Sequence, residues 1–356
     1  MKPITLAVDA MGGDFAPEVV VQGVCAAVRQ SDLRILLVGN PEAISPFLKK
    51  EMYGDDRIEI IPTFQSIPMD ASPKKALEEF PEASMIKAAK LVQSGAADAL
   101  ISAGNTGALV LSAARNIPRI QNVHRTALAA VYPTLNELKR KDIFSLILDV
   151  GANVLVDPEN LVHFALMGSS YASEIKGIQD PAVALLNMGS EPNKGGPRYA
   201  EAYAILSELP HINFIGNIEG HDLLRGIADV VVTEGLVGNV AIKTIEGSAE
   251  TVMGLGKMAF KQKFIWKLGL IMLSSGIRGL KKLTDYQEYG GAPILGLNKL
   301  VLKCHGKSTS RAIHNAIKLA AKSIRDDLTG NMQRSIRTFE ETIIKPGDSY
   351  VTAYES

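Results

Sequence analysis

Short, apolar, β-branched runs alternate along the chain with glycine-containing polar loops and with stretches whose apolar residues recur every three or four positions. The runs predict strands at residues 4–8, 35–38, 58–61, 97–101, 143–150, 183–186, 214–218, 230–233 and 300–304. The three- and four-residue spacing predicts helices at 16–29, 85–93, 159–175 and 198–206. Several strands show almost no polar alternation, which is typical of strands covered on both faces.

This order of elements favours an α/β fold in which helices cross over between parallel strands. The expected architecture is a doubly wound, three-layer α/β/α sandwich. No long linker, internal repeat or low-complexity tract interrupts the pattern. We therefore expect one catalytic domain over residues 1–356.

Residues 251–284, called the basic segment below, differ from the rest of the chain. They include seven lysine or arginine residues and no acidic residue, and they enclose a strongly apolar stretch. This composition predicts a protruding basic, apolar helical hairpin that lies in the surface of an anionic membrane. The alternative is a pair of dimer-contact or core helices with solvated lysines. The residues predicted to make the contact are Phe264, Trp266, Leu270, Lys263 and Lys267.

Composition narrows the classes of function. With 46% hydrophobic residues in 356, the chain can bury a large core, and disorder is not expected. Lysine plus arginine and aspartate plus glutamate number 38 each, so no overall charge recruits nucleic acid. Two cysteines, no signal-peptide pattern and no spanning stretch of roughly 20 apolar residues predict a cytoplasmic protein, at most peripherally bound to a membrane.

The loops that follow the predicted strands are unusually rich in glycine, asparagine and aspartate. They lie at residues 9–14, 102–107, 149–153, 187–194, 234–239 and 305–308. Because parallel strands end at one edge of a sheet, we expect these six loops to converge there. Glycines allow close backbone approach, and helix N-termini offer free N–H groups, so a phosphate or similar oxyanion is the predicted ligand. The alternative for any single loop is a tight turn or a helix cap.

Several common chemistries do not fit these loops. Gly306-Lys307-Ser308 has Val301 where a phosphate-binding P-loop requires glycine, and no Gly-x-Gly-x-x-Gly follows the first strand. No serine-hydrolase elbow or zinc-protease motif is present, and Cys304 is expected to be a core residue. With no nucleophile evident, we predict direct attack by a bound substrate, with no metal and no organic cofactor.

Five motifs follow one another across residues 1 to about 325. They are Leu6-Ala-Val-Asp-Ala-Met-Gly-Gly-Asp14, Ser102-Ala-Gly-Asn-Thr-Gly-Ala108, Leu148-Asp-Val-Gly-Ala-Asn153, Gly238-Asn-Val240 with Lys243 and Glu246-Gly247, and Cys304-His305-Gly306. Together, and in this order, these motifs resemble those of the bacterial phosphate acyltransferase (PlsX) family.

The resemblance implies a fold akin to isopropylmalate dehydrogenase and phosphotransacetylase, and a homodimer. The implied reaction converts acyl-acyl carrier protein and inorganic phosphate into acyl phosphate and free carrier protein. The product would pass to an acyl-phosphate:glycerol-3-phosphate acyltransferase in phospholipid synthesis. As an alternative to lying in a membrane surface, the basic segment is a candidate for docking the acidic carrier protein by electrostatic steering.

The reaction requires a cradle for phosphate, a donor for the oxyanion and a proton for the departing thiol. We predict Lys194 as the source of charge beside residues 102–107, Asn105 and Asn239 as oxyanion donors, and His305 as proton carrier. The predicted substrate- and phosphate-binding residues are Asp9, Gly12, Gly13, Asp14, Ser102, Gly104, Thr106, Gly107, Asp149, Asn153, Asn187 and Lys243. Within this set, Asp9 and Asp14 are expected to brace loops. A strand-end or capping role for His305 and a structural ion pair for Lys243 stay open.

Two departures from the family pattern leave alternatives open. Glu78, Glu79 and Pro81 stand where the family has basic residues, and Val237 stands where it has a threonine. These changes are compatible with a divergent or phosphotransacetylase-like enzyme that uses acyl-CoA, or with a non-catalytic membrane scaffold.

Overall fold

A computed structural model describes residues 3–51, 56–262, 269, 272 and 290–343. Its strands are β1 (Ile4–Asp9), β2 (Leu33–Gly39), β3 (Ile58–Pro62), β4 (Ala99–Ser102), β5 (Ala127–Pro133), β6 (Phe144–Leu148), β7 (Ala182–Leu186), β8 (Asn213–Ile218), β9 (Val230–Val232), β10 (Ala292–Leu295) and β11 (Leu300–Lys303). Its helices are α1 (Glu18–Gln30), α2 (Pro41–Lys50), α3 (Pro73–Glu79), α4 (Ser84–Gln93), α5 (Thr106–Asn116), α6 (Pro158–Lys176), α7 (Pro197–Glu208), α8 (Gly235–Gln262), α10 (Ser310–Arg325) and α11 (Leu328–Ile343), with a 3-10 turn η1 (Gly220–Asp222).

The strands form one sheet in the order β3-β2-β1-β4-β11-β10-β5-β6-β9-β7-β8. One block, β3 to β11, is parallel, and so is the second block, β6 to β8. Between them, β10 is antiparallel to both β11 and β5, and β5 is antiparallel to β6. The two blocks therefore run in opposite directions. All the predicted strands are present, but the expectation of uniformly parallel strands was wrong because β5 and β10 were not predicted.

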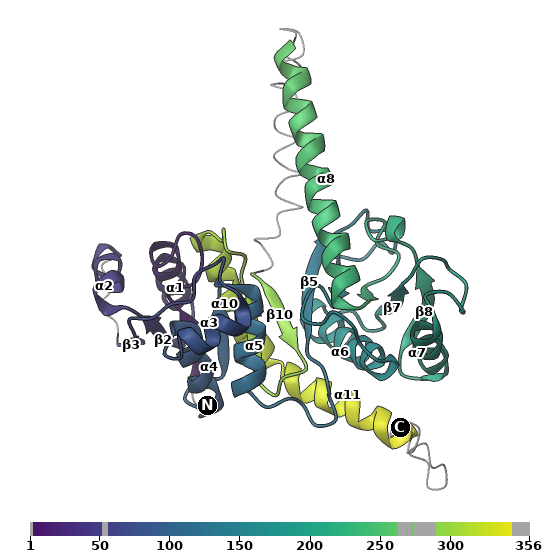
Figure 1. The fold of residues 1–356 in the computed structure, drawn as a ribbon, viewed down its shortest axis with the longest axis horizontal. Helices are drawn as coiled ribbons and strands as arrows, with labels where there is room; N and C mark the ends of the chain where they lie inside the picture. Colours follow the sequence, from purple (N-terminus) through teal and green to yellow (C-terminus); the bar gives the residue numbers. More distant parts are fainter. Residues whose placement is uncertain (1–2, 52–55, 263–268, 270–271, 273–289, 344–356) are drawn as a thin grey trace.

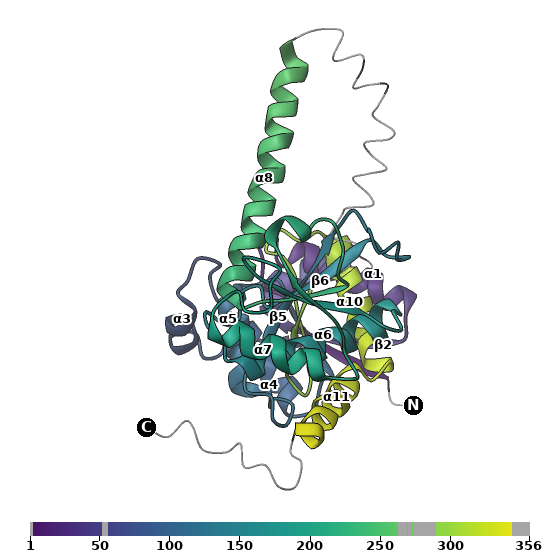
Figure 2. The ribbon, with the colours of Figure 1, turned by 90° about the vertical axis from the view of Figure 1, so that its right-hand side faces the viewer.

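Helices cover both faces of this sheet, which confirms the three-layer α/β/α fold. Side chains alternate along the strands as β geometry requires, so that Leu6 and Val8 join one buried cluster and Ala7 joins the other. The first cluster is completed by α1, α2, α6, α7, α10 and α11, and the second by α3, α4, α5 and the first turns of α8. Figures 1 and 2 show these layers from two directions.

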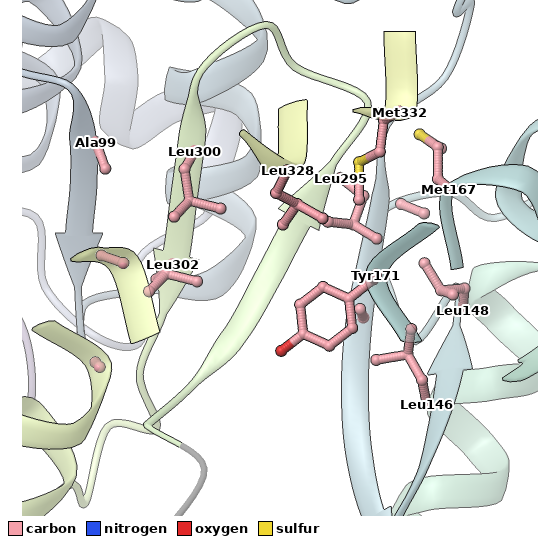
Figure 3. Close-up of a cluster of buried hydrophobic side chains, with 14 of the residues drawn as sticks. Ala99, Leu146, Leu148, Met167, Tyr171, Leu295, Leu300, Leu302, Leu328 and Met332 are labelled. Atoms are coloured by element: carbon pink, nitrogen blue, oxygen red, sulfur yellow. The ribbon is translucent and has the colours of Figure 1, made fainter. Parts of the chain in front are cut away.

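The first cluster is continuous across the point where strand direction reverses. Figure 3 shows members of this cluster on both sides of that point: Leu302 of β11 at the left, Leu295 of β10 near the centre and Leu148 of β6 at the right, with Met332 of α11 and Met167 of α6 at the upper right. Burial of each such side chain contributes about 1.5–3 kcal/mol. The assignment of residues 1–356 to one domain stays a prediction, and this shared core is consistent with it.

Helix α8 projects away from the sandwich (Figures 1 and 2). It begins at Gly235, well before the predicted start of the hairpin at residue 251. Ile242 is buried in the second cluster, whereas Val252 and Met253 farther along are exposed. The predicted contact residues Phe264, Trp266, Leu270, Lys263 and Lys267 lie outside the described residues. Among the helices that the structure describes, none is long and apolar enough to span a bilayer.

Candidate active site

The glycine-rich loops lie at two opposite edges of the sheet. Residues 9–14, 102–107 and 305–308 follow β1, β4 and β11, and we call their location the Asp9 edge. Residues 149–153, 187–194 and 234–239 follow β6, β7 and β9, which run the other way, and we call their location the Asp149 edge. The prediction that all six loops meet at one edge was wrong, because the antiparallel pairings of β10 and β5 reverse the second block.

A buried carboxylate network organises the Asp9 edge. Asp9 accepts hydrogen bonds from the hydroxyls of Ser84 and Ser102, both at 2.6 Å, and from the backbone N–H of Met11 at 3.1 Å. Burial raises the pKa of Asp9, and the bonds from Ser102 and Ser84 oppose that shift. Ser102 Oγ also accepts from the backbone N–H of Gly104 at 3.0 Å. The expected bracing role of Asp9 is compatible with this geometry.

Close backbone approach explains the glycines of this edge. A Cβ atom on Gly12 would collide with Asp9 Oδ2 and lie 2.6 Å from the backbone N of Gly104. Gly13 has a φ of +109°, a region that side chains disfavour. The Asp14 N–H donates to the carbonyl of Gly306 at 2.8 Å. The three loops of the Asp9 edge are thus bound to one another without intervening side-chain bulk.

Asn105 caps helix α5. Its Oδ1 accepts from the N–H of Ala108 at 3.0 Å, and its Nδ2 donates to the carbonyls of Met69 and Ala71, both at 3.0 Å. Both N–H groups of the amide are therefore in use, which favours a structural role over the predicted role as oxyanion donor. The first helical residues, Thr106 and Gly107, leave the N-terminal end of α5 accessible to an anion.

Lys303 also lies at the Asp9 edge, although it was not among the site residues predicted from the sequence. It ends β11 with only 8% of its surface exposed, and its ammonium donates to the carbonyls of Ala103, at 3.2 Å, and Cys304. Burial lowers the pKa of Lys303 to about 8, although the charges of Cys304, Asp9 and Asp14 act in the opposite direction. The signal was present in the sequence, because a lysine inside a buried strand is rare unless it is paired or functional.

His305 is oriented by the backbone of its own loop. Its Nδ1 accepts from the N–H of Lys307 at 3.0 Å, so the neutral ring carries its proton on Nε2. Local burial and the positive charges of Lys303 and Lys243 lower the pKa of His305, which keeps the ring neutral near pH 7. A neutral ring with its proton on Nε2 suits a hydrogen-bond donor better than the predicted proton carrier.

Lys243 lies in an ion pair, as the structural alternative for this residue states. Its Nζ is 2.6 Å from Glu246 Oε2, one turn along the exposed side of α8. A cation that already has a carboxylate partner at this distance offers less charge to a phosphate. This pairing favours the structural role.

The Asp149 edge is also held by a buried carboxylate, which accepts mainly from backbone N–H groups where Asp9 accepts from two serine hydroxyls. Asp149 accepts backbone N–H groups from Leu128 and Gly151, both at 3.0 Å, and from Ala152 at 2.9 Å. Burial raises its pKa, and these bonds oppose the shift. Asn153 donates from Nδ2 to Asp149 at 2.8 Å and to a carbonyl at 2.7 Å, which uses both of its N–H groups. Asn239 donates to the carbonyl of Val150 at 3.0 Å.

Lys194 does not reach the loop with which it was predicted to act. Strand β7 stands six positions from β4 in the sheet, which at about 4.8 Å per strand is about 29 Å, and its end lies at the opposite edge. The Nζ of Lys194 is 4.0 Å from Glu191 Oε1, and the carbonyl of Lys194 accepts from Asn187 Nδ2 at 2.9 Å. Within one chain, the predicted pairing of Lys194 with residues 102–107 was wrong.

The Asp9 edge is therefore the stronger candidate site. It combines a buried acid and a buried lysine whose pKa values are both shifted, three closely packed glycine loops and an accessible helix N-terminus. Perturbed titratable groups at the end of parallel strands are typical of active sites in α/β enzymes. The arrangement can bind an oxyanion through backbone N–H groups and one cation.

The fold resembles those of solved acyl-transferring enzymes. A phosphotransacetylase from Streptococcus pyogenes superposes with a TM-score of 0.60 at 18% identity, over 91% of this chain and 95% of that one. A branched-chain phosphotransacylase from Enterococcus faecalis V583 gives a TM-score of 0.55 at 15% identity, over 90% and 99% of the two chains. At these identities the likeness concerns the fold alone, and it confirms the phosphotransacetylase-like architecture.

Other relatives are much more similar in sequence than these solved structures are. Residues 4–330 match the family model described as "Fatty acid synthesis protein". The phosphate acyltransferase of Heliobacterium modesticaldum is 42% identical over 93% of this chain and 97% of its own length. That of Geobacillus thermodenitrificans is 42% identical over 94% and 99%. The chain therefore belongs to the phosphate acyltransferase family of enzymes.

Proposed function

We propose that this enzyme transfers a fatty acyl group from acyl carrier protein to inorganic phosphate, and that the acyl phosphate supplies the acylation of glycerol 3-phosphate in phospholipid synthesis. The observation that carries the proposal is Lys303, a buried cation at the meeting point of the three glycine loops. The description of the family as a fatty acid synthesis protein and the absence of acidic residues from the basic segment also support it.

In the proposed mechanism the Asp9 edge binds phosphate. Backbone N–H groups at the start of α5 and the ammonium of Lys303 hold the dianion. Two of the three N–H groups of Lys303 have acceptors within the described chain, which leaves one for the ligand. The Asp9 network keeps Gly104 and the start of α5 in place.

The chemical step forms one bond and breaks one. A phosphate oxygen attacks the thioester carbonyl carbon, and the neutral His305 donates from Nε2 to the developing oxyanion. When the tetrahedral intermediate collapses, the C–S bond breaks. The sulfur leaves as the thiol of the carrier protein after it takes the proton that the hydrogen phosphate brought. No residue becomes acylated, because the bound phosphate is itself the nucleophile.

The test is a phosphate-dependent turnover assay with palmitoyl-acyl carrier protein and palmitoyl-CoA, in which hydroxylamine traps the acyl phosphate. Wild-type enzyme is expected to use the carrier-protein substrate. Lys303→Met should lower kcat/KM by at least about 100-fold, a loss comparable to removal of one group that stabilises transition-state charge. Lys194→Ala is the matched control, because it removes a cation at the other edge of the sheet.

Other results of this assay would favour one of the alternative functions or the other edge of the sheet. Turnover of the CoA substrate alone would favour the phosphotransacetylase-like alternative, and no turnover from folded protein would favour the scaffold alternative. Loss of activity in Lys194→Ala but not in Lys303→Met would place the reaction at the Asp149 edge.

We also propose peripheral association with an anionic membrane through α8 and the basic segment. The described part of α8 exposes apolar residues in succession, namely Val252, Met253, Leu255 and Met258. An exposed helix with apolar residues on several sides requires a covering surface. A homodimer is proposed as well, and α8 is a candidate for that contact if it does not bind lipid.

A further inference from the structure

Three side chains of metal-binding type meet between α6 and α11. Glu159 and His163 are one turn apart on α6, and Glu340 comes from α11; one ligand atom of each lies within 4.8 Å of the others. His163 Nε2 is 3.4 Å from Glu340 Oε1 and 3.9 Å from Glu159 Oε1. The group lies beside the start of α6, at the end of the sheet opposite the Asp9 edge. It therefore has no part in the reaction proposed above.

His163 makes this group more than a set of surface acids. The residue is completely buried, and neither ring nitrogen has a hydrogen-bond partner among the described residues. Phe339 packs against it edge to face with ring centroids 5.7 Å apart, which fixes the plane of the ring. Buried polar atoms are usually satisfied, so an unpartnered imidazole nitrogen within 4 Å of two carboxylate oxygens indicates a missing ligand between them.

We infer that Glu159, His163 and Glu340 bind a divalent transition-metal ion, with Zn²⁺ as the best match. Zinc bonds of about 2.0–2.2 Å in a tetrahedron place ligand atoms about 3.3–3.6 Å apart. The 3.4 Å separation of His163 from Glu340 lies in this range, and the half-exposed Glu159, at 3.9 Å, would have to move closer on binding. A neutral imidazole ligand disfavours Mg²⁺ and Ca²⁺, which select oxygen atoms. Three protein ligands leave the fourth position of the tetrahedron to a water molecule.

The ion would join the C-terminal helix to the body of the enzyme. Met332, Ile336 and Phe339 of α11 are buried against the first hydrophobic cluster, and Glu340 follows them directly. A bond from Glu340 through the ion to His163 crosses from α11 to α6, so the site is structural and strengthens the docking that these apolar side chains begin.

The experiment uses the full chain, stripped with a chelator and returned to phosphate-free buffer. Zn²⁺ affinity is measured by competition with a chromophoric chelator, Co²⁺ coordination by its visible absorption, and stability by thermal unfolding. Wild type should bind about one Zn²⁺ per chain, show a Co²⁺ spectrum of a four-coordinate site and unfold at higher temperature with Zn²⁺. Glu340→Gln should weaken Zn²⁺ binding by more than about tenfold.

Glu341→Gln is the matched control, since Glu341 is the next residue on α11, is exposed and pairs with Arg337. It should bind Zn²⁺ as wild type does. Glu159→Gln, at a half-exposed position, provides a second ligand variant if Glu340→Gln disturbs α11. Equal Zn²⁺ affinity in wild type and in both ligand variants would overturn the proposal, as would a wild type without a Co²⁺ spectrum or a thermal shift. A wild type without a Co²⁺ spectrum or a thermal shift would favour a protonated Glu340 that donates a hydrogen bond to His163.

Discussion

The hydroxyl of Ser102 donates to Asp9 Oδ2 at 2.6 Å and accepts from the N–H of Gly104 at 3.0 Å. A single side chain therefore ties the end of β4 to the end of β1 and fixes the loop that leads into α5. Asp9 and Ser102 are both almost completely buried, so water does not compete for these bonds. The position of the proposed phosphate cradle depends on this contact.

Ser102→Ala should destabilise the enzyme and reduce its activity together. The variant removes the hydroxyl that donates to Asp9 Oδ2 and accepts from the Gly104 N–H, and loss of a partner for a buried polar group costs about 1–3 kcal/mol. Urea unfolding followed by circular dichroism measures the change in the free energy of unfolding. Ser94→Ala, which removes an exposed hydroxyl bonded to the carbonyl of Leu91, should change that free energy by no more than about 0.5 kcal/mol. Equal stability of the two variants would contradict the bridging role of Ser102.

Much of the fold follows from the sequence because its buried strands are apolar and β-branched. Strand β9, for example, is three valines, and all the strands predicted from such runs are present. The two strands that were missed lack this signal: β5 reads ALAAVYP and is rich in alanine, and β10 has four residues that follow two glycines. Their antiparallel pairing reverses half of the sheet, so a local omission changed the predicted location of three loops.

The candidate site was predictable in its loops but not in its assembly. Gly12, Gly13 and Ser102 are recognisable from composition, whereas the distance from Lys194 to them depends on strand order across the whole sheet. Lys303 was overlooked because it was counted as part of an apolar run. Asn105 illustrates a second limit, because a cap and a catalytic donor have the same sequence signature until the acceptors of the amide are known.

Gly12→Ala should abolish most of the activity, because the added methyl group would push Asp9 away from its serine partners. Overpacking of this kind costs about 1–3 kcal/mol. Gly247→Ala is the matched control: the site is exposed on α8, and outside the helix's own backbone and the neighbouring residues no atom lies within 4 Å of the added Cβ. Alanine there should stabilise the helix by up to about 1 kcal/mol. Turnover assays and thermal unfolding of both variants test the pair, and full activity in Gly12→Ala would disprove the crowding argument.

Activity should decline as pH rises through about 8, where Lys303 loses its proton and its attraction for phosphate. The measurement is kcat/KM for phosphate between pH 6.5 and pH 9.5. We expect Lys303→Met to be slow across that whole range and to lack the decline. A wild-type profile that stays flat above pH 8 would exclude Lys303 as the phosphate cation.

Stability should rise at alkaline pH, where activity is expected to fall. Because the pKa of Lys303 is lowered from 10.5 to about 8 in the fold, the unfolded chain binds more protons between these two pH values. The free energy of unfolding should therefore rise over that window in wild type relative to Lys303→Met. Denaturant titrations at pH 7.5 and pH 10 give the comparison, and an identical pH dependence in both proteins would show that Lys303 is not desolvated.

The exposed apolar surface of α8 should bind anionic lipid. In the variant with Leu255→Gln and Met258→Gln, two exposed apolar side chains are removed without a change of charge. Binding to phosphatidylglycerol vesicles, measured by flotation, should weaken by at least about tenfold, because burial of one such side chain contributes about 1.5–3 kcal/mol. Thr251→Gln, one turn before Leu255 and also exposed, is the control and should float as wild type does. Sedimentation velocity distinguishes lipid binding by α8 from a dimer contact. If the double variant floats normally but dissociates into monomers, α8 is a dimer contact and the membrane proposal is wrong.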